Sequence, residues 1–165
     1  MTRTRIAGIF YLLTFATGIF ALFVQSRFSA ASGLIGGVCY LVVTVILYGV
    51  FKPVNRPLSA AAAMVSFAGF AAGVLGFALA TSMVFFGVYC TLIGILALRS
   101  TFAPRVVGVL MVIAGLAWLT FLSPPLVTSL RPYVLTAGFV GEGSLTLWLL
   151  LAGADTAAAP RAVRM

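Results

Sequence analysis

The sequence predicts an all-α integral membrane bundle of six transmembrane helices joined by short loops, and three observations predict it. Hydrophobic residues make up 63% of the 165 residues, while charged residues make up 7%, too few to cover a water-soluble globule. The mean hydropathy is +1.24. Basic residues separate apolar stretches of about 20 residues, the length that a helix needs to cross the hydrocarbon core of a bilayer. We therefore expect residues 1–165 to form a single integral membrane domain.

Four apolar stretches have the length of one span each, and a fifth stretch is twice as long. The single spans are predicted at residues 6–24, 33–51, 106–122 and 134–152. Residues 58–98 contain no Asp, Glu, Lys, Arg, Asn, Gln or His, and one helix of that length would extend about 60 Å. We expect two helices there, at 58–79 and 82–98, with the turn at the polar pair Thr81 and Ser82.

The basic residues test this division independently. With six spans, eight of the ten basic residues fall on one side of the membrane: Arg3, Arg5, Lys52, Arg56, Arg99, Arg105, Arg161 and Arg164. Arg27 and Arg131 fall on the other side. Treating residues 58–98 as one span would divide the ten residues five against five. The positive-inside rule therefore predicts six spans with both termini cytoplasmic.

The first stretch also has features of a secretory signal peptide. Arg3 and Arg5 resemble its positive n-region, and residues 29–31 resemble a cleavage site. The apolar run at 6–24 is longer than the 7–15 residues typical of a signal-peptide core. We therefore favour a retained membrane helix.

The composition excludes several kinds of chemistry. The chain has no His, which excludes an ordinary His-ligated haem, the usual zinc sites and a His-based catalytic relay. Two carboxylates cannot build an all-carboxylate metal cage, so we expect no metal and no cofactor. Cys39 and Cys90 lie in apolar runs and are expected to be buried apolar side chains. The net charge of +8 is spread singly between apolar runs, and we expect no nucleic-acid partner.

Glu142 is the one carboxylate within a predicted span, and a glycine flanks it on each side. An ionised acid at the bilayer centre costs several kcal/mol, about 2.5–3.5 for Asp on insertion scales. Two interpretations stay open: a proton or substrate site, or a protonated acid that fastens two helices by hydrogen bonding. Counting about 1.5 Å per residue from the outer helix ends places three polar residues near its depth. The candidate intramembrane proton or ligand site is therefore Glu142, Tyr40, Tyr89 and Thr17.

The predicted inner loop between residues 98 and 106 carries a basic motif of Arg99, Pro104 and Arg105. We interpret the motif as a device that orients the chain and attracts anionic lipid head groups. The alternative is a binding site for an anionic ligand.

Glycines and tryptophans suggest how the helices pack. Gly69 and Gly73 form one GxxxG motif, and Gly33 with Gly37 forms another. Such pairs let helices approach closely, and we favour packing within the chain over dimerisation. Trp118 and Trp148 lie near predicted helix ends and are expected to be interfacial anchors.

Two segments resemble a known family. Residues 98–110 (LRSTFAPRVVGVL) and 141–150 (GEGSLTLWLL), the latter followed by Gly153, resemble the bacterial family called domain of unknown function 4386. Residues 5–12 (RIAGIFYL), with Gly18, are similar to its first helix. The resemblance implies a multi-pass protein of the bacterial inner membrane with no assigned activity. Because family members are generally longer, it also implies a chain shortened around residues 58–98. The residues that match the family's pattern are Arg99, Pro104, Arg105, Glu142 and Trp148.

The function predicted from the sequence is non-catalytic: a scaffold, an accessory subunit or a lipid-associated module. Short loops and the scarcity of nucleophile–base pairs favour it. The alternative is a small-solute or proton-coupled transporter centred on Glu142, although a permeation path usually needs several polar groups. An intramembrane enzyme ranks third, because Glu142 is the only plausible base. The expected partner is a bilayer with anionic head groups on the inner side; a protein partner or homo-oligomer stays open.

Overall fold

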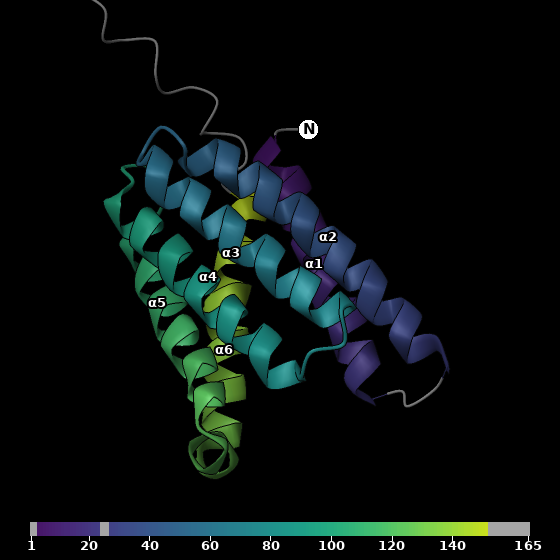
Figure 1. Ribbon diagram of the computed structural model, residues 1–165. Helices are drawn as coiled ribbons and strands as arrows, with labels where there is room; N and C mark the ends of the chain where they lie inside the picture. Colours follow the sequence, from purple (N-terminus) through teal and green to yellow (C-terminus); the bar gives the residue numbers. More distant parts are fainter. Residues whose placement is uncertain (1–2, 24–26, 152–165) are drawn as a thin grey trace, which may run out of the picture. The chain divides into compact units, whose positions relative to one another are not determined.

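The computed structural model describes residues 3–23 and 27–151, and helices make up nearly all of this part (Figure 1). The helices are α1 (Arg3–Phe23), α2 (Arg27–Phe51), α3 (Arg56–Val74), α4 (Leu79–Arg99), α5 (Arg105–Leu119), the short 3-10 helix η1 (Thr120–Leu122) and α6 (Pro124–Leu151). The described residues contain no strand. The predicted all-α helical bundle is therefore confirmed.

Five helical segments, in α2 to α6, are long and apolar enough to cross a membrane. Their side chains are mostly unburied, and many of the exposed ones are large and apolar. Met64 on α3 is 67% exposed, Val109 on α5 is 47% exposed and Leu147 on α6 is 61% exposed. Water would penalise such surfaces, whereas lipid acyl chains would not. The helices are thus compatible with a membrane protein.

The contacts divide the chain into two units. The first unit comprises α1, α2 as far as Leu47 and the end of α6 from Thr146. The second unit runs from Tyr48 to Leu145 and contains α3, α4, α5, η1 and most of α6. Each unit has its own buried side chains.

Within the first unit, two glycines allow helices to approach closely. A Cβ on Gly36 of α2 would lie 2.6 Å from Oγ1 of Thr17 on α1. The Ser32 hydroxyl donates a hydrogen bond to the Thr17 carbonyl at 3.0 Å. A Cβ on Gly8 would lie 2.8 Å from Cγ of Leu150 at the end of α6. Helix α1 is therefore packed against α2 and against the last turns of α6.

The predicted turn at Thr81 and Ser82 is wrong. Helix α3 ends at Val74 and α4 begins at Leu79, so the turn consists of residues 75–78. The polar pair lies instead in the first turn of α4.

Gly76 explains the earlier turn. Its φ is +80°, a left-handed conformation that glycine adopts without the steric cost of a Cβ. The Phe77 N–H donates to the Ala72 carbonyl at 3.0 Å, and the Gly76 N–H donates to the Gly73 carbonyl at 3.2 Å. These two bonds form a Schellman motif, which satisfies the last carbonyls of α3.

Several helices begin or end differently from the predicted spans. Helix α6 begins at Pro124, ten residues before the predicted start of the last span, so Arg131 lies within a helix rather than in a loop. Pro124 and Pro125 stand at the first helical positions, where a missing N–H costs nothing because that group has no partner within the helix. Helix α2 begins at Arg27, six residues before its predicted start. Arg161 and Arg164 lie outside the described residues.

Glycines also bring α4 and α5 together in the second unit. A Cβ on Gly87 would lie 2.8 Å from the Gly115 carbonyl oxygen, and a Cβ on Gly94 would lie 2.8 Å from the Gly108 carbonyl oxygen. The two glycines on each helix are seven residues apart, which puts both on one face. The seam between α4 and α5 is therefore backbone against backbone. On the other side of α4, a Cβ on Gly69 of α3 would lie 2.7 Å from Cβ of Phe85.

Candidate intramembrane site

Glu142 is buried between helices of the second unit, with 6% of its surface exposed. Its Oε1 accepts a hydrogen bond from Nε1 of Trp118 on α5 at 3.0 Å. An indole N–H can only donate, and both the ionised and the protonated carboxyl can accept from it. The contact therefore pairs two buried polar groups in either protonation state of the acid.

Two glycines on α6 make room for this pair. Gly138, one turn before the acid, lies against the Trp118 indole: a Cβ there would lie 2.7 Å from Cε2 of the ring. A Cβ on Gly141 would lie 2.5 Å from Cβ of Ala114 and 2.6 Å from the Leu110 carbonyl oxygen. Any larger residue at either position would separate α6 from α5. The glycines thus set the distance at which the indole reaches the acid.

Trp118 is packed on its other sides by aromatic rings of the same unit. Phe86 meets the indole edge-on at a centroid distance of 5.8 Å, and Phe121 lies tilted at 5.9 Å. Trp118 is only 8% exposed. The expectation that it anchors the chain at the lipid interface is therefore wrong: its N–H is directed at a protein acceptor. Trp148 is also buried, at 7% exposed.

Helix α4 contributes two further buried groups to the second unit. Cys90 is completely buried and lies within electrostatic range of the Glu142 carboxyl. Tyr89 is 1% exposed. We call Glu142, Trp118 and Cys90 the Glu142 cluster. Its three residues come from α4, α5 and α6.

Thr17 and Tyr40, the other predicted site residues, belong to the first unit. The Thr17 hydroxyl donates to the Leu13 carbonyl at 2.8 Å, within its own helix. The Tyr40 ring meets Tyr11 edge-on at 6.5 Å and is 9% exposed. Both residues have local packing partners, and their grouping with Glu142 stays a prediction.

The basic motif lies at one end of the second unit. Arg99 ends α4, Arg105 begins α5, and Pro104 precedes it; all three are exposed. Phe102 in this loop stacks on Phe51 at the end of α2, with ring centroids 5.7 Å apart. The α4–α5 loop and the α2–α3 loop are therefore neighbours at one end of the unit (Figure 1).

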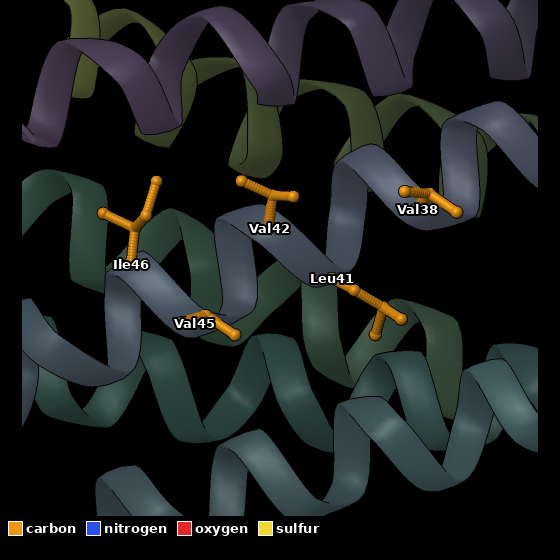
Figure 2. Close-up of a pocket in the computed structure, with 5 residues that line it drawn as sticks. All are labelled: Val38, Leu41, Val42, Val45 and Ile46. Atoms are coloured by element: carbon orange, nitrogen blue, oxygen red, sulfur yellow. The ribbon is translucent and has the colours of Figure 1, made fainter.

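The described residues around this site offer no metal-binding group. Among the described residues, no group of three or more His, Cys, Asp or Glu could hold a metal ion. An open depression runs along one face of α2, and Figure 2 shows its aliphatic lining of Val38, Leu41, Val42, Val45 and Ile46. Such a surface suits an acyl chain better than a polar solute.

A comparison with known families matches the part of the chain that contains the site. Residues 77–153 match the family described as Domain of unknown function (DUF4386). This part of the chain, which is less than half of the sequence, is similar to that family. The resemblance recognised in residues 98–110 and 141–150 is thereby confirmed, whereas residues 5–12 lie outside the match. The DUF4386 match contains α4, α5 and α6, and so all of the Glu142 cluster. Comparisons with curated proteins and with solved structures found no match.

Sequence reasoning missed Trp118 as the partner of Glu142. The available signal was Gly138, because a glycine one turn before a buried acid leaves room for a large donor on the neighbouring helix. Depth alone favoured tyrosines, since it carries no information about which way each helix is rotated.

Proposed function

We propose that this protein is a non-catalytic, multi-pass protein of the bacterial inner membrane, which acts as a scaffold or accessory subunit. In this proposal Glu142 is a structural acid that fastens α6 to α5. The observation that carries the proposal is the Trp118–Glu142 hydrogen bond at 3.0 Å between two buried side chains.

The surroundings of the acid support a structural role. Glu142 is 6% exposed, and the close α5–α6 contact at Gly141 adjoins it directly. Carrier-type proton or solute transport needs alternating access to the binding group from each side of the membrane. Opening this contact would remove the only hydrogen bond described for the indole and expose an acid to lipid. Both changes are costly in a membrane.

Proton flux in proteoliposomes tests the proposal. Vesicles containing the protein and an internal pH-sensitive dye would be given a potassium diffusion potential. We expect internal acidification at the rate of protein-free vesicles for the native chain and for Glu142→Gln alike. Gln keeps an oxygen that can accept from Trp118 but cannot exchange a proton, so it isolates the titratable function.

The second candidate is a proton-coupled transporter centred on Glu142. The burial of a titratable carboxyl in an apolar helix favours it, because acids within membrane helices commonly mark proton or ion pathways. Under this alternative the native protein accelerates acidification, and Glu142→Gln abolishes the acceleration with its melting temperature unchanged. That result would overturn the structural proposal.

A further inference from the structure

Two loops place four exposed cations at one end of the second unit. The α2–α3 loop carries Lys52 and Arg56, and the α4–α5 loop carries Arg99 and Arg105; all four side chains are exposed. The Phe51–Phe102 stack joins the loops, with ring centroids 5.7 Å apart and an angle of 29° between the rings. Phe51 itself is fully buried. The cations therefore belong to one surface, which we call the basic end.

No described carboxylate neutralises the basic end. Glu142 is the only carboxylate among residues 3–23 and 27–151, and it is buried against Trp118. Four like charges on adjoining loops repel one another and favour an anion between them. An anion that neutralises these cations would come from outside the described residues.

Both loops are held in shape before any ligand arrives. Asn55 caps α3 by accepting from the Leu58 N–H at 3.0 Å. In the other loop the Ser100 hydroxyl donates to the Ala97 carbonyl at 2.8 Å and accepts from the Ala103 N–H at 3.2 Å. An ordered loop loses little conformational entropy on binding.

Apolar side chains beside the cations indicate what kind of anion fits. Leu98, next to Arg99, is 37% exposed, and Val106, next to Arg105, is 67% exposed. A free phosphate or a nucleic acid would leave these surfaces in water. An anionic phospholipid would place its phosphate among the cations and its acyl chains against the apolar neighbours. Helix α5 also begins here without a side-chain cap, so its positive dipole end faces the same anion.

We propose that the basic end is a binding site for the phosphate head group of an anionic phospholipid, held jointly by the α2–α3 and α4–α5 loops. The interaction is specific to this end of the unit. Arg131 on α6 is also exposed, but it stands alone on its helix, outside the two joined loops.

Native mass spectrometry of the full chain, titrated with phosphatidylglycerol, tests the site. Arg56→Gln and Arg105→Gln each remove one charge from one loop, and Arg131→Gln is the matched control. Near an anionic surface one Lys or Arg contributes about 1 kcal/mol, so we expect each loop variant to weaken binding about fivefold. The control should leave binding unchanged, and phosphatidylcholine should bind weakly to all forms.

Two outcomes would overturn the site. Equal weakening by Arg131→Gln would mean that only overall charge attracts the lipid. Displacement of phosphatidylglycerol by inorganic phosphate at equal concentration would mean that the loops bind free phosphate and that the acyl chains contribute nothing. Circular dichroism melting of each variant excludes a loss of fold as the cause.

Discussion

Glu142 and Trp118 form the hydrogen bond on which the proposed structural role of the acid rests. The sequence identifies the acid as the residue to explain, because no other carboxylate lies in an apolar stretch. It could not identify the donor. Trp118 stands near a helix end, and only the rotation of α5 relative to α6 turns its indole inward rather than toward the lipid interface.

Removing the donor should destabilise the protein. Trp118→Phe keeps an aromatic ring but leaves the Glu142 carboxyl without the indole N–H, which we expect to cost about 1–3 kcal/mol. Thermal unfolding in detergent, followed by circular dichroism, measures the loss as a lower melting temperature.

The double variant Trp118→Phe/Glu142→Leu provides the control for this prediction. Replacing both partners with apolar groups removes the donor and the acceptor of this hydrogen bond together, so the double variant should be more stable than the sum of the single changes implies. Simple additivity of the two losses would show that the hydrogen bond contributes nothing.

At the scale of helices, apolar runs indicate where a helix exists, whereas a single glycine can determine where it ends. Runs of apolar residues identified the helices because their length is set by the bilayer. They did not identify the ends, because a helix can extend beyond an apolar run wherever the backbone allows it, as α6 does from Pro124 and α2 from Arg27. The α3–α4 turn lies before the polar pair at Thr81 because Gly76 supplies the left-handed residue that ends α3.

The two glycines that flank Glu142 give a matched test of helix packing. A Cβ on Gly141 would lie 2.6 Å from the backbone oxygen of Leu110, whereas a Cβ on Gly143 would meet nothing within 4 Å. We expect Gly141→Ala to cost about 1–3 kcal/mol through overpacking. Gly143→Ala should be neutral or stabilising by up to about 1 kcal/mol, because alanine favours the helix. Melting temperatures of both variants check this; equal effects would rule out the close α5–α6 contact.

For the whole molecule, the positive-inside rule predicts the orientation in a membrane. The rule needs cations concentrated at one end of the helices, and the second unit has such an end. The α2–α3 and α4–α5 loops adjoin through Phe51 and Phe102, and both carry exposed cations. Helices α3 and α4 run away from them to an uncharged turn at residues 75–78. The cations of each loop could be predicted from the sequence. The proximity of the two loops could not, because it depends on how the helices pack.

Cysteine labelling tests the orientation. Phe77→Cys places a thiol in the uncharged turn, and Thr101→Cys places one in the basic end; both native side chains are exposed. A membrane-impermeant maleimide should label Phe77→Cys in intact cells and Thr101→Cys only after permeabilisation. The native chain is the background control, since Cys39 and Cys90 are buried. Labelling of Thr101→Cys in intact cells would contradict cytoplasmic basic loops.

The glycine seam between α4 and α5 has a consequence for assembly. Gly87 and Gly115 touch backbone to backbone, and these contacts join residues close in the sequence. The α4–α5 hairpin can therefore reach its register without contacts from distant segments. If one helix shifted along the other, a side chain would clash with a backbone carbonyl. We therefore expect α4 and α5 to pair first during insertion. Helix α6 would then pack last against this pair, and its Glu142 would accept the hydrogen bond from the Trp118 indole.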